Sequence, residues 1–116
     1  LVKIIRNSFT PECEDKIREY VEQEIEQFES RQAEHIRRIR FYSDSIEFHQ
    51  KQIDNSTENR DRYTRGTDGW KHFNNEIQHF RQAVREDKAL LRTWKSAYNS
   101  NIKNHDFCEK VLEIVA

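Results

Sequence analysis

Residues that interrupt helices are almost absent from this chain. One proline and two glycines occur among 116 residues, which favours long helices and disfavours tight-turn β structure. No apolar run approaches the roughly 20 residues that span a bilayer. Methionine is missing altogether, even at position 1. A mature secreted chain without its signal peptide shows this pattern, and so does a trimmed chain.

Apolar residues are also scarce. The hydrophobic set makes up 34% of the chain and the charged set 35%, and the mean hydropathy is −1.09. Such a chain suits a narrow seam between helices better than a thick core. Disorder is the rival for so polar a chain, but a regular spacing of aromatic residues opposes it. The net charge of −1 gives no global attraction to nucleic acid or to an anionic membrane.

Motifs for catalysis are missing as well. The sequence contains neither a glycine-rich phosphate loop nor a nucleophile elbow, so we expect a non-enzymatic protein without a cofactor. Glu76 and His79 form one Glu-x-x-His motif and share a helix face with His72. Di-iron bundles need two such motifs and two further glutamates. We therefore predict no metal site, with a lone divalent-cation site as the alternative.

The chain does contain two long stripes of large residues at helical spacing. The steps within each stripe are three and four residues, once the polar residues Asp87, Asn101 and His105 are counted as filling the gaps of the second stripe, and this spacing places the members on one helix face. Thr10-Pro11-Glu12 gives the first segment a strong helix start. The first stripe is Ile17, Val21, Ile25, Phe28, Gln32, His35, Ile39, Tyr42, Ile46, His49 and Ile53, and the second is Trp70, Phe73, Ile77, Phe80, Val84, Leu91, Trp94, Tyr98, Cys108, Leu112 and Val115.

These stripes predict a single all-α domain over 1–116. A stretch rich in Asn, Ser, Thr and Gly separates them and is typical of a connector. Weak helix formers around 99–106 leave open whether the second helix continues or breaks into a short third one. The predicted segments are an N-terminal arm at 1–9, a long helix at 11–53, a connector at 54–69, a second helix at 70–98, and a continuation or third helix at 102–115.

The two stripes match when the chain is folded as an antiparallel hairpin about this connector. Ile53 then meets Trp70, and the polar outliers His35 and Asp87 face each other. We interpret His35 and Asp87 as a buried polar layer that fixes the register, as single polar seam residues do in coiled coils. A pH switch near neutrality is the alternative.

The same register brings Cys108 beside Glu14, next to Cys13. We therefore predict a Cys13–Cys108 disulfide, which would stabilise the fold by about 4 kcal/mol and place the protein in an oxidising compartment. The predicted fold is an elongated antiparallel helical hairpin, or a small bundle of long helices. A bundle or a homodimer would cover the apolar residues off the seams, which are Tyr20, Ile36, Phe41, Phe48, Leu90 and Val111.

Two surface features are candidates for binding or modification. The segment 36–41 (Ile-Arg-Arg-Ile-Arg-Phe) resembles a heparin-binding pattern, and the register sets it against a second basic stretch. Such a basic belt steers an anionic partner; the alternative is a solvated helix face with neighbouring counter-charges. Asn55 begins an Asn-Ser-Thr triplet, the common pattern of N-glycosylation. The partner-binding candidates are Arg37, Arg38, Arg40, Arg81, Arg85 and Lys88.

The chain resembles one known family. Thr10-Pro11-Glu12-Cys13 opens a long acidic helix, and Phe107-Cys108-Glu109-Lys110-Val111-Leu112 lies late in the chain. In these stretches and in its overall character the sequence is similar to the albicin/anophensin family of anopheline mosquito salivary proteins. The resemblance covers most of the chain and carries over no functional residue.

The resemblance implies an all-helical secreted inhibitor of host defence. Some family members inhibit the alternative-pathway convertase of complement, and others act on the contact (kallikrein–kinin, factor XII) system as anticoagulants. We therefore expect a host plasma protein complex as the partner, with neither nucleic acid nor membrane. The alternative from another class is an intracellular antiparallel coiled-coil interaction module, which free thiols at Cys13 and Cys108 would favour.

Overall fold

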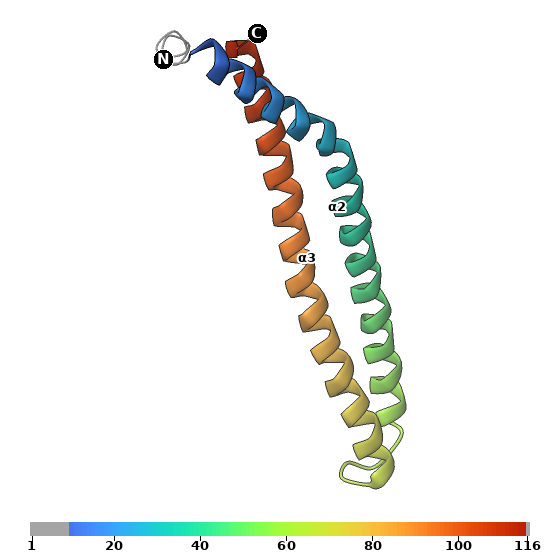
Figure 1. Ribbon diagram of the computed structural model, residues 1–116. Coiled ribbons are helices and arrows are strands. Elements are labelled where there is room, and N and C mark those ends of the chain that lie inside the picture. Colours follow the sequence, from blue (N-terminus) through green and yellow to red (C-terminus); the bar gives the residue numbers. More distant parts are fainter. Residues whose placement is uncertain (1–9, 116) are drawn as a thin grey trace. The chain divides into compact units, whose positions relative to one another are not determined.

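Two α-helices make up nearly all of the described chain. The computed structural model describes residues 10–115, so the predicted arm at 1–9 lies outside the described residues. Helix α2 spans Pro11–Arg60 and helix α3 spans Asp68–Val115 (Figure 1). No strand occurs among residues 10–115, which confirms the predicted all-α class. Neither of these helices has an apolar stretch long enough to cross a membrane.

Side chains just before each helix determine where it begins. The Thr10 hydroxyl accepts a hydrogen bond from the backbone N–H of Cys13 at 3.1 Å, and Pro11 occupies the first helical position. Thr67 does the same for the N–H of Trp70 at 3.4 Å. Each hydroxyl satisfies an N–H that has no partner within its own helix. Asp68, in the first turn of α3, adds a negative charge at the positive end of the helix dipole.

Helix α2 extends well beyond Ile53, so the predicted connector at 54–69 was wrong in its first half. The residues between the helices are 61–67, where Gly66 adopts a positive φ of 88°. The polar residues expected to end α2 instead bond to α3. Ser56 is buried and donates to Glu76 at 3.1 Å, and Arg60 donates to Asn74 at 3.1 Å. These tertiary bonds outweigh the weak helix propensity of Asn, Ser and Thr.

The chain forms two compact units, each built from one stretch of α2 and one of α3. Unit 1 contains the described residues up to Ile36 and those from Ser96 onward, and unit 2 contains Arg37–Lys95. The two stretches run antiparallel within each unit, because early residues of α2 contact late residues of α3. Whether these units fold as a single domain stays a prediction.

In unit 2, apolar packing surrounds a few polar bonds. Ile77 is fully buried and Val84 is 5% exposed. Tyr63, in the connector, stacks on Phe73 with ring centroids 5.8 Å apart. A glycine is needed at 69 because a Cβ there would lie 2.5 Å from the Tyr63 ring. The connector is therefore packed onto the start of α3.

In unit 1, a buried asparagine joins the two helices. Asn101 is 7% exposed, and its side-chain amide donates to the backbone carbonyl of Phe28 at 3.2 Å. The Phe28 ring packs on His105 with centroids 4.1 Å apart. Arg18 donates to the carbonyl of Val115 near the end of α3. The buried apolar side chains of this unit are Val21, Cys108 and Val115.

The longer α2 overturns the predicted pairing of His35 with Asp87. Asp87 accepts a hydrogen bond from Ser45 at 2.7 Å and lies 2.9 Å from Nδ1 of His49. Ser45 is ten residues further along the chain than His35. Moving the turn toward the C-terminus shifts every pairing along α2 by several residues. The polar layer exists, but its histidine is His49.

The same shift overturns the predicted disulfide, because Cys13 and Cys108 are both free thiols. Cys108 is buried and lines the same cleft as Val21. Cys13 stands eight residues before Val21, which is about 12 Å of helix rise. A disulfide requires Cα atoms within about 7 Å of each other, so this register cannot bridge the two cysteines.

Candidate functional site

The structure divides the six predicted partner-binding residues between two places in unit 2. All six are exposed. The contacts of Asp87 with Ser45 and of Phe80 with His49 set the α3 part of the predicted belt beside 45–49, beyond the arginines at 37–40. The continuous basic belt was therefore a consequence of the wrong register. The three α3 members placed away from 37–40 are Arg81, Arg85 and Lys88.

The arginines at 37–40 instead meet a different part of α3. The Arg38 guanidinium lies over the Trp94 ring, 5.5 Å from its centroid, which is a cation–π contact. Basic residues lie on either side of Trp94 in the sequence, and Phe41 beside them is 61% exposed. We call five exposed residues at this level of unit 2 the basic cluster: Arg37, Arg38, Arg40, Arg92 and Lys95. The contact of Arg38 with Trp94 joins its α2 and α3 parts, and its members lie on more than one helix face, because residues two apart do not share a face.

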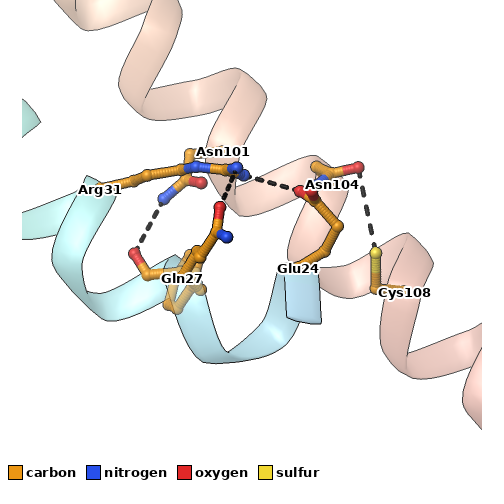
Figure 2. Close-up of polar contacts among 7 residues, drawn as sticks. Glu24, Gln27, Arg31, Asn101, Asn104 and Cys108 are labelled. Carbon is orange, nitrogen blue, oxygen red and sulfur yellow. Dashed lines mark hydrogen bonds and ion pairs between the residues drawn. The ribbon is translucent and has the colours of Figure 1, made fainter. Parts of the chain in front are cut away.

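Unit 1 contains a network of charged and polar side chains that joins α2 to α3 (Figure 2). Glu24 accepts from Arg31 at 2.7 Å and from the amide of Asn104 at 3.3 Å. The hydrogen bond from Arg31 lowers the pKa of Glu24, with help from the charge of Arg31 and the amide of Asn104. The same hydrogen bond raises the pKa of Arg31. Glu24 is therefore a fixed anion at the junction of the two helices.

Beside this network lies a cleft of about 500 Å³ between the start of α2 and the end of α3. The Asn104 side chain contacts both Glu24 and the thiol of Cys108, so it connects the network to the cleft (Figure 2). Burial raises the pKa of the Cys108 thiol, and the negative charge of Glu24 adds to the effect. Lys110 also lines the cleft. The apolar lining consists of Ile17, Tyr20, Val21, Phe107, Val111 and Ile114.

The two aromatic walls of this cleft face solvent. Tyr20 is 64% exposed and Phe107 is 63% exposed. Sequence patterning identified Tyr20 and Val111 as apolar residues that need cover, but it did not place them together or include Phe107. The signal was the set of apolar residues off the seams, whose grouping depends on the register. Large apolar side chains left in solvent and grouped in one cleft mark a binding site.

The Glu-x-x-His motif forms no metal centre in the described structure. Nε2 of His72 lies 3.3 Å from a carboxylate oxygen of Glu76 on the exposed side of α3, and His79 packs edge-on against Phe80. Among residues 10–115, no group of three His, Cys, Asp or Glu side chains is arranged to hold a metal ion. The absence of a metal site stays a prediction.

Asn55 is exposed, as a glycosylation site requires, but it lies within α2 and not in a loop. Its neighbour Ser56 is buried against Glu76. N-glycosylation sites are usually on surface loops. Glycosylation of Asn55 stays a prediction.

Comparisons with known proteins add no assignment to these surfaces. No protein-family model, no curated protein and no solved structure matches the chain. The basic cluster and the cleft are therefore the features of the structure that bear on function.

Proposed function

We propose that this chain is a non-catalytic binding protein, secreted in saliva, that inhibits host defence by docking onto the alternative-pathway convertase of complement. The choice of target rests on the resemblance of Thr10–Cys13 and Phe107–Leu112 to the albicin/anophensin family. The resemblance implies an all-helical fold, and the described structure is all-helical.

The basic cluster is the observation that carries the proposal of a protein-binding surface. It combines exposed arginines with the exposed ring of Phe41 on one end of unit 2. Arginine and aromatic side chains are the residues that contribute most to protein interfaces. A positive surface also accelerates the encounter with an acidic partner. We therefore expect the convertase to contact this cluster through an acidic patch.

A haemolysis assay with erythrocytes that have not been sensitised by antibody tests this proposal, because their lysis depends on the alternative pathway. We expect the protein to inhibit lysis at micromolar concentration or below. The double variant Arg37→Glu with Arg40→Glu should weaken inhibition by at least about tenfold, since charge complementarity becomes repulsion. No inhibition by the unaltered protein would refute the target.

The matched control makes the same charge change elsewhere in unit 2. Arg62 and Lys71 are exposed and lie near the connector, away from the basic cluster. The variant Arg62→Glu with Lys71→Glu should inhibit lysis as the unaltered protein does. Equal loss in both double variants would show that net charge, and not the basic cluster, carries the effect.

The contact system is the second target that the resemblance implies. Activated clotting time and bradykinin release measure inhibition of factor XII and kallikrein. Inhibition there without any effect on haemolysis would replace complement by the contact system. The basic cluster would remain the expected contact surface. The variant Arg37→Glu with Arg40→Glu is then predicted to weaken the inhibition of factor XII and kallikrein.

The free cysteines favour a third candidate, an antiparallel helical interaction module in a reducing compartment. Both thiols are free, and the predicted link that placed the chain in an oxidising compartment is removed. Capture of plasma proteins on the immobilised chain separates the candidates. Recovery of convertase or contact-system components supports the secreted inhibitor, and their absence supports the interaction module.

A further inference from the structure

The charge that lines the cleft of unit 1 is opposite to the charge of the unit itself. The described part of unit 1 carries twelve acidic and five basic side chains. None of those acidic residues lines the cleft, and Lys110 is the one charged residue among its lining residues. The lining of the cleft is therefore apolar apart from the side chains of Asn104 and Lys110, and its one charge is positive.

We propose that this cleft binds a long-chain fatty acid, with the alkyl chain between Tyr20 and Phe107 and the carboxylate at Lys110. The volume of about 500 Å³ falls in the range of about 300–1,000 Å³ typical of small-molecule pockets. Burying the alkyl chain removes its surface and the exposed aromatic rings from water together. The proposed inhibition of complement does not depend on this ligand.

The orientation of the ligand follows from the charges beside the cleft. At the Asn104 end, the charge of Arg31 is already taken up by Glu24, which also bonds to the Asn104 amide, so this end offers a ligand carboxylate no free positive charge. At Lys110 the headgroup gains an opposite charge and remains in contact with water. A cationic headgroup would meet Lys110 and would find no carboxylate in the cleft lining. The site therefore selects an anion.

The dimensions of the cleft favour a single alkyl chain over a peptide helix. The α3 residues that line it run from Asn104 to Ile114, which is about 15 Å of helix rise. A helix with side chains is about 10–12 Å across and would not fit within the cleft over that length. A single alkyl chain is much thinner and can lie along the groove.

Calorimetric titration of the full chain tests the proposal. The protein is first freed of lipid, and sodium oleate is added below its critical micelle concentration. We expect saturable binding to one site per chain, and displacement of a dansyl-labelled fatty acid by the same oleate. Methyl oleate, which lacks the charge, should bind more weakly, and oleylamine should bind most weakly.

Substitutions in the cleft test where the ligand binds. Lys110→Glu should weaken oleate binding by about tenfold, because attraction becomes repulsion, and Lys71→Glu in unit 2 is the matched control. Val111→Trp should abolish binding by filling the cleft. If Val111→Trp fails to fold, as judged by circular dichroism, Phe107→Glu serves instead, because Phe107 is exposed and its replacement spares the interior.

Three results would overturn the proposal. The first is no saturable oleate binding by the folded, lipid-free chain. The second is oleylamine binding as tightly as oleate, since the charge of Lys110 would then have no role. The third is concentration-dependent self-association that Phe107→Glu abolishes while oleate has no effect, because the cleft would then be an interface between two copies of the chain.

Discussion

Cys13 and Cys108 carry free thiols in very different surroundings. Cys108 is 2% exposed and contacts the side chain of Asn104, whereas Cys13 is half-buried near the start of α2. Burial raises the pKa of the Cys108 thiol, and the charge of Glu24 raises it further. Only the thiolate form of cysteine reacts. The burial of Cys108 and its raised thiol pKa therefore both slow its reaction with alkylating reagents.

We therefore expect iodoacetamide to modify Cys13 several times faster than Cys108 at mildly alkaline pH. Mass spectrometry of peptides from a time course measures both rates in the same sample. In urea the two rates should become similar, because unfolding exposes Cys108. A chain that gains no label before reduction would instead contain the disulfide, and the register described above would be incorrect.

Glu24 links charge to stability at a single residue. Its pKa is lowered in the folded chain by the hydrogen bond from Arg31, so the folded state favours the ionised form. The resulting stabilisation is present above the ordinary pKa of a glutamate and is lost as the pH falls through the lowered value.

We expect Glu24→Gln to remove part of the acid dependence of stability. The difference in melting temperature between the unaltered chain and Glu24→Gln should be largest near neutral pH and should shrink as the pH falls. Thermal unfolding at a series of pH values from neutral to acidic measures this difference in melting temperature. Glu26→Gln is the control, since Glu26 is exposed on the same helix. A constant difference at all pH values would contradict the role of ionised Glu24.

At the scale of the helices, Asp87 decides how α2 and α3 are aligned in unit 2. Its side chain is 13% exposed, and its carboxylate meets Ser45 and His49 on α2. A buried carboxylate is costly unless it is paired, so only alignments that bring donors to it are stable. The apolar stripes alone would allow several alignments, because they repeat every seven residues.

We expect Asp87→Ala to lower the free energy of unfolding by about 1–3 kcal/mol, because it leaves Ser45 and His49 without their partner. Asp44→Ala, on the exposed face of α2, should change it by less than about 0.5 kcal/mol. Urea unfolding followed by circular dichroism compares the two variants. Similar losses in both would show that Asp87 acts only through the charge of the helix surface.

At the scale of the whole molecule, the two units differ in charge although the chain is nearly neutral. Unit 2 carries thirteen basic and nine acidic side chains, whereas the described part of unit 1 is strongly acidic. Each unit also has its own buried residues, with Ile77 in unit 2 and Val21 in unit 1. The proposed activities follow this division, with protein binding in unit 2 and fatty-acid binding in unit 1.

Ile77→Ala tests whether the units differ in stability as well. Removing a fully buried isoleucine side chain should cost about 2–5 kcal/mol. Amide hydrogen exchange should accelerate more within 37–95 than in unit 1, because local opening follows compact units. Leu90→Ala, at a site 41% exposed, is the control and should change little. Equal acceleration in both units would show that they unfold together.

Much of the architecture follows from the sequence alone. The three-and-four spacing of apolar residues predicts two long helices, and Thr10-Pro11 predicts where α2 begins, because these signals act over one or two helical turns. The mean hydropathy of −1.09 predicts a thin interior. The sequence pattern also places Tyr20 and Phe41 off the two stripes, where no facing helix would bury them, and both side chains are exposed.

The pairing of residues between helices was decided by tertiary contacts. The stretch 54–60 is a poor helix by propensity, yet Ser56 and Arg60 become helical because Glu76 and Asn74 accept their hydrogen bonds. That extension moves the turn, brings Asp87 to His49 and leaves both cysteines free. Local sequence signals do not include these long-range bonds, whereas a repeating stripe fits several registers nearly equally well. The cleft, which needs the correct register, could therefore be found only in the folded chain.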